Sequence, residues 1–324
     1  MKKYIAGVDI GGTGTKLGLF LLNGEPVRLW SIPTETAGGG SSILKNAAAS
    51  LCGVMQIENA AAGSLAGVGV AVPGAVKDGV HAEVCPNIGW SRKNVAAEFR
   101  EALRGVRDSE YAADSDPAEL PVRVMNDASA AAYGEYRKGA GRDSSAMMMV
   151  TLGTGVGGAF VKDGHLLEGA FGCAGEIGHL NVNPDEREYC SCGRRGCLEQ
   201  YISAGGIVRT AGKYIAAGAE TSLPSGEFTS EDIAEAAEAG DELSCRVMRE
   251  TGSLLGRALA LISCVIDPGL FVIGGGVSEA GSLLTEPAVE SFRRWCYPPV
   301  SETKIVKAEL GGNAGVYGCA LSLI

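Results

Sequence analysis

The chain has 324 residues, 46% of them hydrophobic, which is enough for one large domain or two ordinary ones around a packed core. Its formal net charge of −10 argues against a nucleic-acid partner held by bulk electrostatics. No apolar run is long enough to span a bilayer, and Asp9 interrupts the short apolar stretch that could suggest a signal peptide. We therefore expect no membrane segment. The ten cysteines, several of them in apolar segments, suggest free thiols and a cytoplasmic location.

The first elements read as a strand, a glycine-rich turn and a second strand. The strand "YIAGVDI" is followed by "GGTGT" at 11–15, by "KLGLFLL" and by the turn Asn23-Gly24. Residues 146–169, "AMMMVTLGTGVGGAFVKDGHLLEG", repeat this plan and place Asp163-Gly164 at the corresponding turn. Asn-Gly and Asp-Gly are favoured hairpin turns. Two copies predict a duplicated core with two phosphate-facing hairpins and a cleft between them.

Strands and helices alternate along the rest of the chain, which predicts an α/β fold. For the helix "NVAAEFREALRG", Asn94 is the expected cap and Gly105 the expected end. Residues 108–119 are acidic and predict an exposed loop. The further expected elements are a strand from 65 ended by Pro73-Gly74, strand 121–127, helix 128–139, helices over 230–268, a strand from 270 that runs into the loop Gly274–Gly276, and a closing helix at 313–324.

The two glycine turns can offer backbone N–H groups to phosphate oxygens. They are not Walker A loops, because no G-K-[ST] ending is present. The first turn re-enters a strand and lacks G-x-G-x-x-G spacing, which disfavours a dinucleotide oxidoreductase. Asp9 precedes the first turn on its strand. It is either a turn-stabilising residue or well placed to hold Mg²⁺ through water.

One imidazole and three thiols form a candidate metal set: His179, Cys190, Cys192 and Cys197. The alternative is three unrelated thiols, but the cysteines cluster with charged residues and glycines, which is unusual for core cysteines. Four protein ligands complete a tetrahedral zinc site and leave no open position, so the predicted zinc is structural.

Three acidic residues are candidates for chemistry. Asp127 follows Asn126 between a strand and an Ala-rich helix, where it can cap the helix, act as a general base, or do both. Glu176 and Glu199 flank the metal set and are either solvated surface acids or neighbours of His179. Glu176 lies between small and apolar residues, which favours a functional role.

These segments together resemble the ROK family (repressors, open reading frames, kinases) of sugar kinases, nearly from end to end. The resemblance is carried by "GVDIGGTGTKLGLF", "GVAVPGAV", "PNIGW", "VMNDASAAAYGE", "VTLGTGVGGAFV", "GCAGEIGHL", "CSCGRRGCLEQYIS" and "FVIGGGVS", and is nearest to bacterial ROK glucokinases. It implies an actin-like ATPase fold with two domains and a central cleft. We expect a small domain over 1–125 with a returning helix at about 307–324, and a large domain over 126–306.

The resemblance also implies roles for individual residues. Asp127 is the expected base for the sugar 6-hydroxyl, and Asp9 is expected to assist Mg²⁺. The other expected sugar contacts are Gly74, Asn87, Asn126, Glu176, His179 and Glu199. The expected ATP contacts are Gly11, Gly12, Thr13, Gly14 and Thr15 in the first turn, Thr154 and Gly155 in the second, and Gly274, Gly275 and Gly276 near the adenosine.

The implied activity is transfer of a phosphoryl group from MgATP to the 6-hydroxyl of glucose by a homodimer. The alternatives are a kinase for N-acetylmannosamine, N-acetylglucosamine or another hexose, and a sugar-sensing protein without catalysis. ROK repressors carry a helix-turn-helix before the first phosphate turn. Here only a strand precedes Gly11, so we expect no DNA-binding domain.

Overall fold

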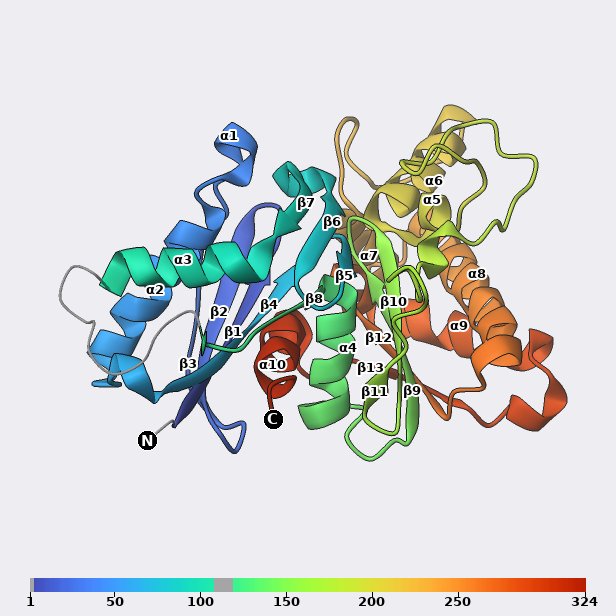
Figure 1. Cartoon of the computed structure of the whole chain (residues 1–324). Coiled ribbons are helices and arrows are strands. Elements are labelled where there is room, and N and C mark those ends of the chain that lie inside the picture. The colour runs from blue at the N-terminus through green and yellow to red at the C-terminus, as the bar shows by residue number, and fades with distance from the viewer. Residues whose placement is uncertain (1–2, 108–118) are drawn as a thin grey trace. The chain divides into compact units, whose positions relative to one another are not determined.

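Two five-stranded sheets organise the part of the chain that the computed structural model describes, residues 3–107 and 119–324 (Figure 1). Their strand orders are β3-β2-β1-β4-β8 and β11-β10-β9-β12-β13. In each sheet the central strand pairs antiparallel with its hairpin partner and parallel with the next strand. The predicted duplication of the core is therefore confirmed.

The first sheet consists of β1 (Tyr4–Ile10), β2 (Gly14–Leu21), β3 (Pro26–Pro33), β4 (Leu65–Val72) and β8 (Val122–Asn126). The second sheet consists of β9 (Ala146–Leu152), β10 (Val156–Lys162), β11 (His165–Leu166), β12 (Leu270–Gly274) and β13 (Lys304–Lys307). A smaller antiparallel sheet consists of β5 (Ala75–Lys77), β6 (His81–Cys85) and β7 (Trp90–Asn94).

The chain divides into two compact units. Unit 1 comprises Met1–Arg142, Glu168–Cys173 and Gly312–Ile324, and unit 2 comprises Asp143–Leu167 and Ala174–Gly311. The division after Arg142 keeps α4 (Asp127–Lys138) in unit 1, whereas we expected the large domain to begin at 126. The reason is close packing against α10 (Ala314–Leu321): a side chain at Gly134 would lie 2.1 Å from the Ala314 carbonyl oxygen.

In unit 1, helices cover both faces of the five-stranded sheet. The helices α2 (Ile43–Ile57) and α3 (Val95–Arg107) lie on one face, and α4 and α10 lie on the other (Figure 1). The short α1 (Ala37–Gly40) precedes α2. The main buried core joins apolar strand residues to α2 and α3, with Phe99 and Leu103 among its members.

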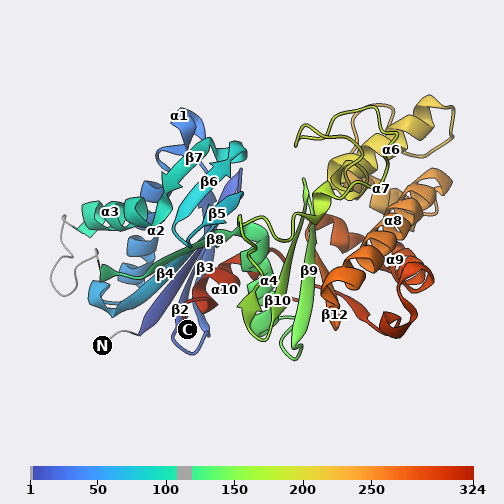
Figure 2. The same cartoon turned by 45° about the vertical axis from the view of Figure 1, so that its right-hand side comes forward.

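In unit 2, the long helix α8 (Glu242–Ile266) packs beside α9 (Ser282–Trp295), as Figure 2 shows. The contact is close because Gly252 and Gly256 bring the two backbones together, and a side chain at Gly256 would lie 2.1 Å from the Ala288 carbonyl oxygen. The remaining helices of this unit are α5 (Glu199–Ile202), α6 (Ala204–Ala216) and α7 (Ser230–Glu238).

Most local expectations are confirmed. Asp163 and Gly164 adopt φ values of 50° and 80°, the left-handed conformation of a tight hairpin turn. Asn94 caps α3, since its Oδ1 accepts a hydrogen bond from the Ala97 N–H at 2.9 Å. The expected end at Gly105 is wrong: α3 continues to Arg107 because one glycine lowers helix propensity without ending a helix.

The acidic loop expected over 108–119 lies, apart from its last residue, outside the described residues. Among the helices of the described segments, none has both the length and the apolar character needed to cross a bilayer.

Candidate functional site

The corner between β8 and α4 presents Asp127 to solvent. Asn126 is the helix cap, since its Oδ1 accepts hydrogen bonds from the Ala128 and Ser129 N–H groups at 2.9 and 3.2 Å. The helix cap is therefore Asn126 and not Asp127. Asp127 occupies the first helical position, is exposed, and accepts a hydrogen bond from the Ala128 N–H at 2.8 Å. Its carboxylate lies at a helix N-terminus, where negative charge is favoured.

Asn126 also makes a hydrogen bond to the backbone at Gly74, in the same unit. Its Nδ2 donates to the Gly74 carbonyl oxygen at 3.1 Å, which uses one of its two amide N–H groups. Gly74 accepts no side chain, because a Cβ there would lie 2.1 Å from the Val84 carbonyl oxygen. Burial raises the pKa of the Cys85 thiol to about 12, and the negative charge of Asp127 contributes to this rise.

Asp9 lies at the end of β1, within the electrostatic field of Asp127. Burial raises the pKa of Asp9 from 3.8 to about 7; the charge of Asp127 also raises it, and the ammonium of Lys16 lowers it. Asp9 packs on α10 so closely that a side chain at Gly315 would lie 2.4 Å from its Oδ2. The structure thus brings two predicted acids, Asp9 and Asp127, into one electrostatically coupled group in unit 1.

The first glycine turn joins β1 to β2 and is closed by a hydrogen bond from the Gly11 N–H to the Gly14 carbonyl oxygen at 3.0 Å. Gly12 and Thr13 are exposed. Gly12 faces Asn87, which is exposed in the short helix η2 (Pro86–Ile88). Thr15 is buried and its hydroxyl bonds the Thr34 hydroxyl at 2.8 Å. Of the two threonines in the turn, Thr13 is exposed, whereas the Thr15 hydroxyl is buried and already bonded.

The second glycine turn, between β9 and β10, lines a pocket of about 500 Å³ in unit 2. Thr154 and Gly276 contribute to its wall, and Gly276 begins the short helix η5 (Gly276–Ala280). Gly275 is left-handed at φ 88°, and a side chain there would lie 2.3 Å from the Leu152 carbonyl oxygen. The two loops predicted to contact ATP therefore pack against each other, and both border this pocket.

One wall of the pocket comes from α7, which the sequence motifs did not identify. It contributes Ser230, Glu231, Ala234, Glu235 and Glu238. These residues read as the solvent face of an ordinary acidic helix, so no local pattern sets them apart.

Four ligand atoms of unit 2 converge as predicted for a metal site. The ring of His179 and the thiols of Cys190, Cys192 and Cys197 have their ligand atoms within 4.8 Å of one another. The Cys192 and Cys197 sulfurs are 3.6 Å apart, and Cys190 Sγ is 3.8 Å from His179 Nδ1. Tetrahedral zinc with bonds of about 2.3 Å to sulfur needs about 3.7 Å between sulfurs, so the donor set fits.

The backbone of residues 180–198, here called the metal loop, accounts for this convergence. The Cys190 N–H donates to the Arg194 carbonyl oxygen at 2.7 Å, which closes a knuckle-like turn. Gly193 and Gly196 have φ values of 81° and 72°. A side chain at Gly196 would also lie 1.8 Å from the Asn183 carbonyl oxygen. The turn therefore requires glycine at both positions.

His179 presents its second ring nitrogen to Glu176. The distance from His179 Nε2 to Glu176 Oε2 is 3.9 Å, and both residues belong to the turn of helix η4 (Ile177–His179) and its cap. Although Glu176 lies between small and apolar residues in the sequence, it is not a buried acid, because its side chain is 51% exposed. The neighbouring glycines are the packed positions: a side chain at Gly175 would lie 2.0 Å from the Gly158 carbonyl oxygen. The sequence therefore places an exposed acid on a rigidly packed turn.

Glu199 connects the metal loop to the second glycine turn. Its Oε2 accepts a hydrogen bond from the Val156 N–H at 3.0 Å, and its Oε1 accepts one from the Ser191 hydroxyl at 3.2 Å. A side chain at Gly155 would lie 2.6 Å from Glu199 Oε2. A carboxylate has about four acceptor positions, so Glu199 retains capacity for a ligand.

Comparison with known proteins places these features in one family. A sequence model of the ROK family matches residues 5–323. A glucokinase from Halalkalibacterium halodurans is 36% identical over 323 residues, covering 98% of this chain and 93% of that protein. An N-acetylmannosamine kinase from Escherichia coli is 30% identical over 316 residues, covering 97% and 96%.

Among solved structures, a ROK family glucokinase from Streptomyces griseus in complex with glucose and AMPPNP has a TM-score of 0.78 and 33% identity, and the match covers 98% of each chain. This likeness confirms the predicted actin-like ATPase fold. Since the family's sequence model and these relatives match nearly the whole chain, the protein belongs to the ROK family.

Proposed function

We propose that this chain is an ATP-dependent glucokinase, which transfers the γ-phosphoryl group of MgATP to the 6-hydroxyl of glucose. Two named glucokinases match nearly the whole chain, one of them solved with glucose and AMPPNP. The observation that supports the phosphoryl-transfer role is the exposed carboxylate of Asp127, which directly follows a parallel strand. Asn126 caps the helix, so Asp127 is not needed as the cap.

In the proposed reaction, Asp127 accepts the proton of the sugar 6-hydroxyl. The sugar oxygen forms a bond to the γ-phosphorus, while the bond from that phosphorus to the β,γ-bridging oxygen breaks and ADP leaves. Gly12 and Thr13 in unit 1, with Thr154 and Gly155 in unit 2, bind the phosphates. Asp9 would help to hold the magnesium of MgATP through water, and that cation would neutralise charge on the phosphates. The 500 Å³ pocket bounded by Gly276 and α7 accommodates the adenosine.

Six residues are proposed to contact the sugar. Gly74, Asn87 and Asn126 belong to unit 1, and Glu176, His179 and Glu199 belong to unit 2. His179 Nδ1 and the three cysteine sulfurs would hold a zinc ion that stabilises the metal loop, and His179 Nε2 is left toward Glu176 and a sugar hydroxyl. Because the four ligands complete a tetrahedron, the zinc has a structural role.

The second candidate is an N-acetylmannosamine kinase, which the Escherichia coli relative favours at 30% identity over 97% of the chain. A sugar-sensing role without catalysis is disfavoured, because Asp127 is present and exposed. The two kinase assignments are separated by measuring kcat/KM for glucose, N-acetylmannosamine and N-acetylglucosamine with MgATP in an ADP-release assay. We expect glucose to give the highest value, and an acetamido sugar ahead of glucose would favour the second candidate.

We further propose a cytoplasmic homodimer. The ten cysteines are free, which suits a reducing compartment. Leu261 and Val265 of α8 are 56% and 82% exposed, beside an apolar pocket of about 400 Å³, and an exposed apolar face of this kind is suited to an interface. Sedimentation equilibrium of the purified protein tests the dimer.

A further inference from the structure

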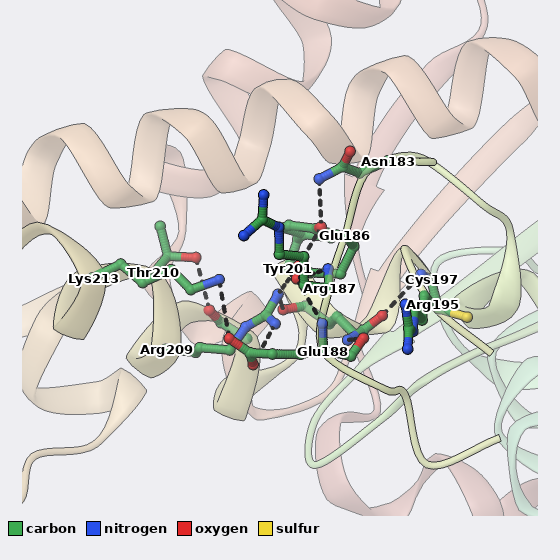
Figure 3. Close-up of polar contacts among 12 residues, drawn as sticks. Asn183, Glu186, Arg187, Glu188, Arg195, Cys197, Tyr201, Arg209, Thr210 and Lys213 are labelled. Atoms are coloured by element: carbon green, nitrogen blue, oxygen red, sulfur yellow. Dashed lines mark hydrogen bonds and ion pairs between the residues drawn. The ribbon is translucent and has the colours of Figure 1, made fainter. Parts of the chain in front are cut away.

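A second set of contacts, which uses none of the four metal-binding side chains, fastens the metal loop to α5 and α6 (Figure 3). We call it the loop brace. Its members are Asn183, Glu186 and Glu188 from the metal loop, Gln200 and Tyr201 from α5, and Arg209 from α6.

Glu186 is the centre of the loop brace. Its side chain is 7% exposed, and Oε2 accepts hydrogen bonds from Tyr201 Oη at 2.6 Å and from Arg209 Nη2 at 3.1 Å. Its Oε1 accepts from the N–H groups of Arg187 and Glu188 at 2.9 and 3.1 Å. These donors, with the Tyr201 hydroxyl first, lower the pKa of Glu186 to about 2. The carboxylate is therefore ionised and its acceptor positions are occupied.

Arg209 joins three segments through one guanidinium group. It donates to Glu186, to Glu188 Oε2 at 2.9 Å and to the Gln200 carbonyl oxygen at 2.8 Å. Its guanidinium also lies 5.1 Å from the centre of the Tyr201 ring. The side chain is only 21% exposed, so these charge-assisted bonds are partly shielded from water.

The hydrogen bond from Arg209 to Gln200 restrains the turn that contains Glu199. Gln200 follows Glu199 directly, and its Oε1 accepts a hydrogen bond from the Cys197 N–H at 3.1 Å. Its Nε2 donates to the Glu188 carbonyl oxygen at 3.1 Å. The loop brace thus holds both neighbours of Leu198–Glu199, while Glu199 itself bonds the Val156 N–H.

We propose that Arg209 is a positioning residue for sugar binding: by tying Gln200 and Glu186 to α6, it fixes the orientation of Glu199. This inference rests on the proposed sugar-kinase function. The metal and the loop brace are then two independent anchors for the same loop, and loss of Arg209 disturbs the sugar site while leaving the metal in place.

The chain offers a matched control triad of the same three residue types. Tyr214 Oη donates to Glu250 at 2.8 Å, Arg246 Nε lies 3.0 Å from Glu250 Oε1, and the Arg246 guanidinium lies 4.2 Å from the Tyr214 ring centre. This triad links α6 to α8. Its Arg246 and Glu250 side chains are 59% and 44% exposed, so it supplies the same chemistry without a link to the metal loop.

The test compares Arg209→Met with Arg246→Met in the zinc-loaded protein. We expect Arg209→Met to raise the KM for glucose about tenfold, which corresponds to about 1.4 kcal/mol, with the KM for MgATP and the zinc content unchanged. Arg246→Met should leave all three values unchanged. Arg209→Lys should recover part of the glucose affinity, because an ammonium group carries the charge but cannot bond three acceptors in a planar fork.

Two further variants cover the case in which Arg209→Met fails to fold because Glu186 is left buried and unpaired. Arg209→Met with Glu186→Gln removes the arginine and the buried charge together, and Tyr201→Phe removes one hydrogen bond. In both, hydrogen exchange at the Cys197 amide should accelerate along with the rise in the KM for glucose.

An unchanged KM for glucose in a folded Arg209 variant, with stability alone reduced, would overturn the positioning role. Wild-type turnover of glucose is measured in the same series. If it is absent, the proposed function fails on the wild-type protein, and that result is distinct from an unaltered KM in the variants.

Discussion

The two units share a strand order but carry different chemistry. In unit 1, Asp9 is the second-last residue of β1, and Asp127, whose charge helps to raise the pKa of Asp9, directly follows β8. In unit 2 the corresponding strand β9 pairs Thr151 with Gly274, and the turn after β9 borders a pocket. The Val156 N–H at the end of this turn donates a hydrogen bond to the Glu199 carboxylate. Under the proposed function, unit 1 supplies the charges for the reaction, and unit 2 supplies the nucleotide pocket and the candidate metal loop. Substitutions in the two units should therefore affect different kinetic constants.

The largest expected effect is in unit 1. Asp127→Asn should reduce kcat by about 10²–10⁴-fold, the usual contribution of a general base, because the amide cannot accept the hydroxyl proton. The change preserves the size of the side chain, and the helix cap remains on Asn126. Glucose binding, measured by calorimetry, should stay close to that of the wild type. Near-normal turnover by a folded variant would remove Asp127 from the proposed role.

In unit 2, loss of a metal ligand should act on sugar binding. Cys192→Ala leaves three ligands, so the zinc content of the purified protein should fall well below one per chain. The metal loop should loosen, and the KM for glucose should rise more than the KM for MgATP because His179 and Glu199 flank the loop. Metal analysis and steady-state kinetics check both statements. A zinc-free variant with wild-type sugar kinetics would separate the metal from sugar binding.

A smaller effect, confined to the nucleotide, is expected from Gly275→Ala in the same unit. The residue has φ 88°, and the added Cβ would lie 2.3 Å from the Leu152 carbonyl oxygen, so the loop must shift. The KM for MgATP should rise while glucose binding stays unchanged. Gly226→Ala is the control, because a Cβ there meets nothing within 4 Å. Equal kinetic constants for the two variants would contradict the assignment of this loop to ATP.

The smallest expected effect is a pH-dependent gain in stability from Asp9→Asn. Burial raises the pKa of Asp9 from 3.8 to about 7, so the folded protein holds a proton that the unfolded chain releases. The contribution of Asp9 to stability is therefore full below pH 3.8 and is lost as the pH rises toward 7. Asp9→Asn should melt a few degrees above the wild type at pH 8, and this advantage should shrink toward pH 4. A melting difference independent of pH would contradict the raised pKa.

The sequence predicts those features that depend on local pattern. Asp163-Gly164 specifies a turn type by itself, and the four candidate metal ligands lie within about twenty residues, so spacing and residue type suffice. The capping arrangement at Asn126 and Asp127 could not be predicted, since both residues are good caps and the choice depends on the Gly74 carbonyl oxygen, 52 residues away.

Long-range contacts account for the other differences. Thr15 looks like its neighbour Thr13, but β3 brings Thr34 against it and buries its hydroxyl. Arg209 and the acidic wall of α7 carry no motif, because each becomes part of a site only after separate segments pack together.

The central claim, ATP-dependent phosphorylation of glucose at the 6-hydroxyl, is tested most directly by identifying the product. Wild-type protein is incubated with MgATP and ¹³C-labelled glucose, and the products are followed by ³¹P and ¹³C NMR. We expect equal amounts of ADP and glucose 6-phosphate, with phosphorus coupling confined to the sugar C5 and C6 carbons. ADP without a sugar ester, or an ester at another hydroxyl, would contradict it.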